Sequence, residues 1–256
     1  MEYLHSLIYL CPLIFLAGFI DSAVGGGGTI SIPAYMLTGM PAHYVFGTNK
    51  LSACLGTALA TGRFIKNKAI DIRTAVIAGA ASLTGAAIGS RIALLLDDRT
   101  FRILLLAALP CVAVFMALRK NTDSGSTAPR LTVKQSAALA SAIGFCIGMY
   151  DGIIGPGTGT FAIIAFNVIM KYDLRTASGN AKVLNLASNL ASLITFALAG
   201  NVLYVIGLPT AACCVLGNYI GAGFAIKKGA RFLRPMLFVV LAILLIKTAW
   251  DLFAPP

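Results

Sequence analysis

Apolar residues dominate the chain in ten segments that are separated by short polar stretches. The segments run over residues 6–24, 28–39, 44–62, 74–96, 101–118, 135–154, 158–170, 176–199, 203–226 and 235–253. A helix needs about 20 apolar residues to cross a bilayer. Most segments approach that length, but 28–39 and 158–170 are too short at about 1.5 Å per residue. The pattern predicts membrane helices interrupted by two broken or re-entrant segments.

Each short segment follows a glycine-rich break, and the two breaks resemble one another. The first break begins at Asp21 and the second at Asp151, and Gly25 corresponds to Gly155 at the same offset. Gly47-Thr-Asn-Lys50 matches Gly179-Asn-Ala-Lys182 farther along the chain. An acid and several helix-breaking residues are costly in a membrane, so their repetition indicates an internal duplication that carries a site.

Lysine and arginine gather in loops, which predicts the orientation of the chain. Four basic loops contain Arg63, Lys66, Lys68 and Arg73; Arg119, Lys120, Arg130 and Lys134; Lys171 and Arg175; and Lys227, Lys228, Arg231 and Arg234. The other side holds Arg91, Arg99 and Arg102 beside two aspartates, and an uncharged Gly200-Asn201 turn. The positive-inside rule places the four basic loops in the cytoplasm and both termini outside it.

These observations predict an all-α polytopic membrane protein built as an inverted repeat. Each half has about four membrane-spanning helices plus the broken or re-entrant segment. Residues 1–118 form the first half, residues 119–134 a cytoplasmic linker, and residues 135–256 the second half. We expect a multi-pass protein of the cell (cytoplasmic or inner) membrane, and assembly as a homo-oligomer is left open.

Composition agrees with this class and excludes others. The chain of 256 residues is 58% hydrophobic and 11% charged, whereas soluble domains have about a quarter charged residues. The net charge of +11 does not predict nucleic-acid binding, because the basic residues lie in short loops and form no basic helix face. The cysteines lie in apolar segments without metal-ligand spacing and are expected to be buried apolar residues.

Lys50 and Lys182 are the repeat-related lysines near the start of apolar helices. An unpaired lysine in a membrane costs about 2.5–3.5 kcal/mol, so both are candidates for a site. The alternative is that they extend to the lipid interface. Asn185 and Asn189 follow Lys182 at helical spacing, and this polar stripe serves either interhelical packing or a solute path.

The glycine breaks predict where an anion binds. A helix that starts after Gly28 or Gly157 has unpaired N–H groups and the positive end of its dipole at its first turn, and such ends bind anions. Two such ends with two lysines predict a cationic pocket at the midplane. Tight helix packing is the alternative use of the glycines.

The predicted substrate-binding residues come from both halves. They are Gly25, Gly26, Gly27, Gly28, Thr29, Thr48, Asn49, Lys50, Gly155, Gly157, Thr158, Thr160, Lys182, Asn185 and Asn189. Because the second stripe is more polar, we expect the second half to contact the solute more. Asp21 and Asp151 pair with a lysine, carry a proton, or bind amides of the glycine loop, and the sequence leaves these roles open.

Catalytic chemistry finds no support in the residue pattern. There is no Ser/His/Asp set, and the two histidines, His5 and His43, lie near segment ends. Gly25–Gly28 is not a nucleotide-binding loop, because no Gly-Lys-Ser/Thr follows it. We therefore predict a protein that is not an enzyme and has no cofactor and no metal, with a small anionic solute and the lipid bilayer as its partners.

Four stretches resemble the motifs of one family. GFIDSAVGGGGTISIP, GTNKLSACLGT, YDGIIGPGTGTF and GNAKVLNLASNLASL are similar to motifs of the TauE/SafE family of sulfite-exporter-like permeases, over roughly residues 8–250. The resemblance implies a helical inverted-repeat permease for sulfite, thiosulfate, sulfonates or other organic anions. The second motif resembles a subgroup described only as probable membrane transporters.

The resulting expectation is a secondary transporter that moves a small, sulfur-containing or organic anion by alternating access. An anion channel and a non-transporting membrane scaffold or enzyme remain the alternatives.

Overall fold

The computed structural model describes residues 4–118 and 132–228, and all regular elements in these ranges are helical. After a short 3₁₀ turn (Leu4–Ser6), the first half forms α1 (Leu7–Val24), α2 (Gly28–Met36), α3 (Ala42–Lys66), α4 (Ile72–Leu95) and α5 (Asp98–Leu118). The second half forms α6 (Val133–Ile153), α7 (Thr158–Ile164), α8 (Leu174–Leu198) and α9 (Tyr204–Lys228). The apolar segment 235–253 and most of the predicted linker lie outside the described residues.

The lengths of the helices follow the apolar pattern. Four described helices are long and apolar enough to cross a membrane: Ile72–Leu95, Val133–Ile153, Leu174–Leu198 and Tyr204–Ile226. α3 is a continuous helix of 25 residues, but polar residues such as Lys50 lower its hydrophobicity. The short segments form α2, with nine residues, and α7, with seven residues and a π-helical continuation over Ala165–Ile169. The predicted all-helical membrane class is confirmed.

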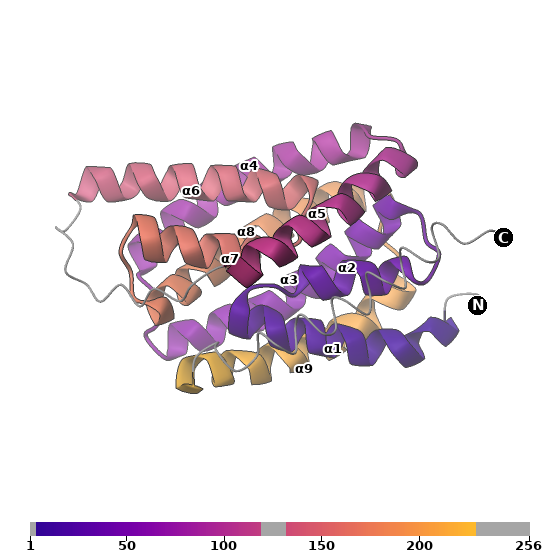
Figure 1. Cartoon of the computed structure of the whole chain (residues 1–256), viewed down its shortest axis with the longest axis horizontal. Coiled ribbons are helices and arrows are strands. Elements are labelled where there is room, and N and C mark those ends of the chain that lie inside the picture. Colours follow the sequence, from indigo (N-terminus) through magenta and orange to yellow (C-terminus); the bar gives the residue numbers. More distant parts are fainter. Residues whose placement is uncertain (1–3, 119–131, 229–256) are drawn as a thin grey trace.

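The packing of the helices repeats between the halves. α1 packs on α9 as α6 packs on α4, and α3 packs on α9 as α8 packs on α4. In Figure 1, α1 runs from right to left and α6 from left to right, although they are corresponding helices. This arrangement agrees with an inverted repeat, whose orientation relative to a membrane remains a prediction.

Glycines allow the long helices to approach closely. A Cβ on Gly148 of α6 would lie 2.3 Å from the carbonyl oxygen of Ser82 on α4. On the corresponding pair, a Cβ on Gly221 of α9 would lie 2.2 Å from the carbonyl oxygen of Phe19 on α1. Small residues at such contacts are typical of membrane helix packing. The halves are therefore joined by two backbone-to-backbone seams.

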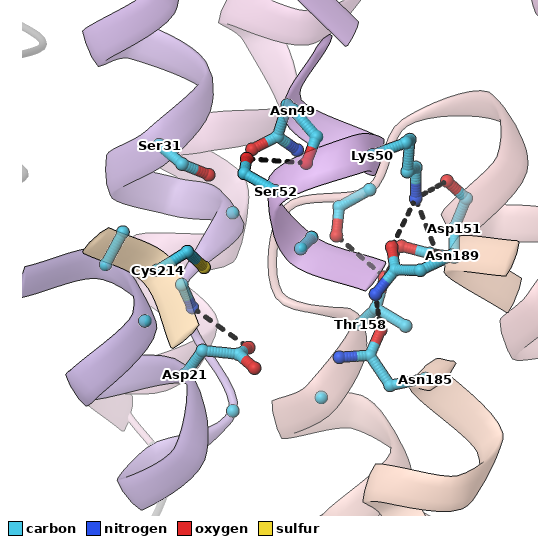
Figure 2. A pocket seen from close by; sticks show the side chains of 18 of the residues that line it. Asp21, Ser31, Asn49, Lys50, Ser52, Asp151, Thr158, Asn185, Asn189 and Cys214 are labelled. Atoms are coloured by element: carbon cyan, nitrogen blue, oxygen red, sulfur yellow. Dashed lines mark hydrogen bonds and ion pairs between the residues drawn. The ribbon is translucent and has the colours of Figure 1, made fainter. Parts of the chain in front are cut away.

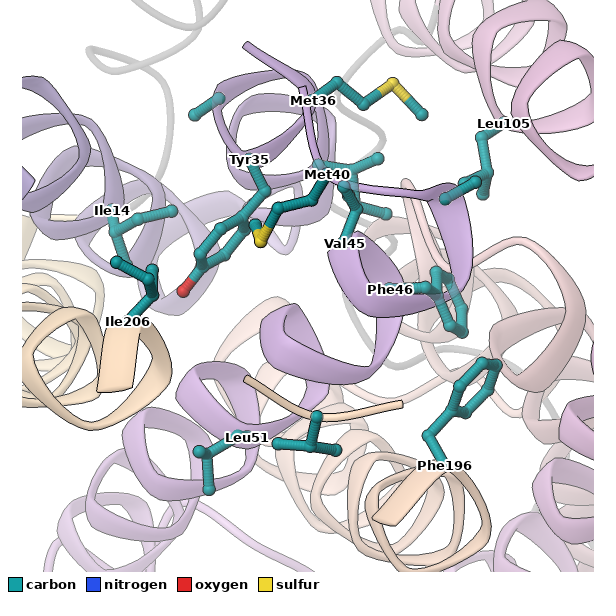
Figure 3. Packing of buried hydrophobic residues seen from close by; sticks show 14 of the residues in the cluster. Ile14, Tyr35, Met36, Met40, Val45, Phe46, Leu51, Leu105, Phe196 and Ile206 are labelled. Carbon is teal, nitrogen blue, oxygen red and sulfur yellow. The ribbon is translucent and has the colours of Figure 1, made fainter. Parts of the chain in front are cut away.

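Buried apolar side chains from both halves form a core beside the pocket described below. Phe46 of α3 stacks edge-on with Phe101 and contacts Phe196 of α8, with ring centroids 5.4 and 5.2 Å apart. Figure 3 shows Tyr35 and Met40 in the same cluster. This core includes residues of both halves, so it fixes α2 and α3 against α8 and α9.

We expect Gly148→Ala to destabilise the fold, because its methyl group must displace the backbone of α4. Overpacking of this kind costs about 1–3 kcal/mol. Gly62→Ala is the matched control, since Gly62 lies in α3, is exposed, and has no atom within 4 Å of the added Cβ. Thermal unfolding of detergent-solubilised protein checks this, and equal melting temperatures for the two variants would contradict it.

Candidate functional site

The two glycine breaks lie against each other at the centre of the molecule. The backbone N–H of Thr160 donates to the carbonyl oxygen of Gly25 at 2.9 Å. A Cβ on Gly25 would lie 2.4 Å from the carbonyl carbon of Gly159. Gly25 and Gly155 also have positive φ values of 85° and 87°, which favour glycine. These glycines therefore serve tight packing and chain reversal, whatever else they do.

A buried ion pair links the second break to α3. Lys50 Nζ lies 2.7 Å from Asp151 Oδ2, and both side chains are almost completely buried. The ammonium also donates to the Asp151 carbonyl at 2.9 Å and to Asn189 Oδ1 at 3.2 Å. The remaining carboxylate oxygen, Asp151 Oδ1, accepts from Thr158 Oγ1 at 2.7 Å. The pair is thus enclosed by α3, α6, α7 and α8.

A second ion pair links the first break to α8 in the corresponding way. Lys182 Nζ lies 2.6 Å from Asp21 Oδ2 and donates to the Asp21 carbonyl at 2.6 Å. Asp21 Oδ1 accepts from the Gly27 N–H at 3.4 Å, which is a long hydrogen bond. Each aspartate therefore pairs with a lysine of the other half and also bonds its own glycine loop.

These pairs change two sequence interpretations. Lys50 and Lys182 are 1% and 2% exposed, so the alternative in which they extend to the lipid interface is wrong. The expectation of a pocket made cationic by two lysines is also corrected, because each ammonium faces a carboxylate. In their charged forms, the four groups have no net charge.

A small polar cavity of about 40 Å³ lies between the breaks. Figure 2 shows Asp21 across the cavity from the Lys50–Asp151 pair, and the amide nitrogen of Asn185 directed into it. The lining residues are Ala17, Gly18, Asp21, Gly25, Gly27, Gly28, Ser31, Asn49, Lys50, Ser52, Ala53, Asp151, Gly155, Gly157, Thr158, Gly159, Asn185, Asn189, Cys214 and Asn218. Both halves line the cavity, and a larger share of solute contacts for the second half stays a prediction.

Most of the predicted site residues lie together at this cavity, but five do not line it. Thr29 bonds the Gly26 carbonyl, and Thr48 Oγ1 accepts from the Leu203 N–H at 3.0 Å. The Thr160 N–H is bonded to Gly25, and Lys182 is paired with Asp21. These five residues, Gly26, Thr29, Thr48, Thr160 and Lys182, therefore support the site from outside the lining.

The helix starts offer fewer donors than the sequence predicted. The N–H groups of Thr29, Ile30 and Ser31 donate to the carbonyls of Gly26 and Gly27 within the turn. Tight turns before α2 thus satisfy donors that an isolated helix start leaves open. Side-chain donors around the cavity become more important in consequence.

Sequence reasoning did not select several residues of the lining. The polar ones are Ser31, Ser52 and Asn218, and Asn218 lies in the uncharged part of α9. A buried amide in a run without charges is a signal that could have identified it. Asn218 Oδ1 accepts from Ser22 Oγ at 2.6 Å, which joins α9 to α1 beside the cavity.

Asn49 has a polar atom without a partner at the cavity. It is 5% exposed, and its Oδ1 has no hydrogen-bond partner. A buried unpaired polar atom is costly unless water or a ligand satisfies it. Among the described residues, no group of three or more His, Cys, Asp or Glu side chains could hold a metal ion.

Comparison with known proteins identifies similar sequences over almost the whole chain. Residues 10–248 match the family model described as sulfite exporter TauE/SafE. The probable membrane transporter protein YfcA of Escherichia coli (strain K12) is 32% identical over 259 residues, which cover 98% of this chain and 95% of YfcA. A probable membrane transporter protein of Haemophilus influenzae is 32% identical over 237 residues, 93% of this chain and 92% of the relative. No solved structure matches significantly.

We expect Lys50→Met to destabilise the protein by about 3–5 kcal/mol, because it leaves the Asp151 carboxylate buried without its cation. The double variant Lys50→Met/Asp151→Asn removes both charges and should recover much of this loss. Thermal unfolding in detergent measures both. A single variant that is no less stable than the double variant would show that the pair does not compensate two buried charges.

Proposed function

The chain belongs to the sulfite exporter TauE/SafE family, and on this premise we propose that it is a secondary transporter of a small anion. The polar cavity between the two glycine breaks is the observation that carries the proposal. We place the anion in this cavity and assign its movement to alternating access between the two halves. Sulfite is the solute that the family description names, and we extend the proposal to thiosulfate and small sulfonates as related sulfur-containing anions.

The size of the cavity supports a small solute. A cavity of about 40 Å³ holds about three water molecules, at roughly 10–15 Å³ for each. A compact oxoanion takes a similar space, whereas a large organic anion requires the helices to move apart. A solute bound between these lining residues loses part of its water and depends on the donors of the lining.

Side chains around the cavity can replace the water that an anion loses. The amide of Asn185 points into the space, and Lys50 contributes a nearby positive charge, although its three N–H donors are already bonded to Asp151 and Asn189. The amide of Asn49 can turn by half a rotation, which directs its NH₂ group to the place of the unpaired Oδ1. Hydrogen bonds to a charged acceptor are stronger than those to a neutral one, so these two amides beside a positive charge suit an anion.

Two hydrogen-bonded contacts join the halves outside the lining of the cavity. In one contact, Tyr172 of the second half bonds Asp71 at 2.8 Å and Thr74 at 2.7 Å, both in the first half. In the other contact, Tyr35 of the first half bonds Thr210 of the second half at 2.6 Å.

The Tyr35 hydroxyl also contacts Ser52 near the middle of α3, whereas Asp71 follows the C-terminal end of that helix. We assign the two contacts to two gates, one of which opens while the other remains closed.

The basic loops give the proposed orientation. Arg63, Lys66 and Lys68 lie near the Asp71–Tyr172 gate, which we therefore place on the cytoplasmic side of the inner membrane. The short turn between α4 and α5, with Arg99 beside Asp97 and Asp98, is then extracytoplasmic. This arrangement also places the N-terminus outside the cytoplasm.

We expect Asn185→Ala to lower anion affinity about tenfold, since it removes a donor to a charged ligand. Thr195→Ala is the control, because Thr195 lies on the same helix, away from the cavity, and bonds only the Ala191 carbonyl. Saturable uptake of labelled sulfite or thiosulfate into proteoliposomes measures the effect. Absence of flux for every anion tested would reject a transporter, and unitary currents in planar bilayers would favour a channel.

Cysteine labelling tests the orientation. Arg99→Cys should react with a membrane-impermeant maleimide in whole cells, whereas Lys66→Cys should react only after the cells are permeabilised. Both positions are exposed. Lys66 precedes α4 and Arg99 follows it, so they lie beyond opposite ends of that helix. The parent protein, with its own six cysteines, gives the background. The reverse labelling pattern would invert the assignment.

A further inference from the structure

The two repeat-related ion pairs have the same chemistry but different surroundings. The Asp151 side chain is 3% exposed, and both of its oxygens accept short hydrogen bonds, from Lys50 and from Thr158. The Asp21 side chain is 15% exposed, and its Oδ1 has only the long contact with the Gly27 N–H. One carboxylate is therefore held on all sides, whereas the other has an oxygen free to change its partner.

The position of Asp21 relative to its lysine adds a second difference. Lys50 lines the cavity together with Asp151, but Lys182 does not line it, although its partner Asp21 does. The Asp21 carboxylate therefore stands between the Lys182 ammonium and the cavity. As long as it is ionised, it screens that positive charge from anything bound in the cavity.

Charge balance makes this arrangement significant for an anion. The two lysines and two aspartates have no net charge, so a bound monoanion would leave an enclosed, partly dehydrated site with one uncompensated negative charge. Such a charge is costly inside a membrane protein. Either a proton or another cation must accompany the anion.

We propose that Asp21 takes up one proton when a monoanion binds, so that anion and proton movement are coupled at this residue. The proposal rests on the anion transport proposed above. The proton adds to the Asp21 carboxylate and gives a neutral carboxylic acid, while Lys182 keeps its proton. The Lys182 charge is then no longer screened and compensates the anion, and the site stays neutral.

The groups that face Asp21 agree with this role. Within the described residues, α8 presents Lys182, α9 presents Cys214 and the neutral amide of Asn218, and Lys50 and Asp151 lie across the cavity. The titratable residue of α2, Tyr35, is bonded to Ser52 and Thr210, and α7 has no titratable side chain. Lys182 is thus the ion-pair partner of Asp21. Protonation of Asp21 removes the negative charge that compensates the Lys182 ammonium.

The test uses the purified full chain with methanesulfonate, a monoanion that does not titrate near neutral pH, and with thiosulfate as a second probe. In weakly buffered solution with a pH dye, methanesulfonate binding should take up about one proton per anion. The affinity for methanesulfonate should weaken about tenfold for each unit that the pH rises, over the range in which free Asp21 is ionised. Asp21→Asn should bind without proton uptake and without this slope.

Two further variants keep the assignment falsifiable. Asp21→Glu should restore proton uptake, and Asp151→Asn should keep the pH slope whatever its absolute affinity. Binding by the parent protein without proton uptake would overturn the coupling while leaving the transport proposal intact. Loss of the slope in Asp151→Asn alone would overturn the assignment to Asp21. If neither anion binds the parent protein, the proposed anion site itself fails.

Discussion

The reciprocal Lys–Asp pairing is the interaction on which the rest of the site depends. A lysine or an aspartate alone inside a membrane protein is costly, and removing either partner exposes that cost in the other. Lys50 meets Asp151 and Lys182 meets Asp21, so each pair crosses between the halves. Because each aspartate immediately precedes a glycine break, the pairs fix both breaks against the long helices α3 and α8.

The glycines of the two breaks allow the close backbone approach that brings the ion pairs together. Gly25 lies against Gly159, and no Cβ fits between their backbones. The chain can therefore reverse within the membrane region while the Thr160 N–H and the Gly25 carbonyl satisfy one another. A small cavity is left where the reversed segments and the two ion pairs enclose polar groups, which explains why a polar space exists in so apolar a chain.

The sequence predicted the parts of this site but not how they combine. Matching the halves identified Asp21, Asp151, Lys50 and Lys182 as a set, since such residues are rare in apolar helices. The match between the halves did not predict that each lysine pairs with the aspartate of the other half, because this pairing depends on how α3 and α8 cross. The same limit explains Ser31 and Asn218, whose place at the cavity follows from helix packing that no local pattern encodes.

Duplication creates two equal pairs, and the departures from equality are what allow a function. Pro156 occupies the place of Gly26, and the π-helical turn after α7 has no counterpart among the described residues after α2. If both pairs were enclosed like Lys50–Asp151, the net charge of the site would stay at zero, and the charge of a bound anion would not be compensated. With both as open as Lys182–Asp21, neither break would be firmly held. One closed pair keeps the two halves in register, and one open pair leaves a charge that can respond to a solute.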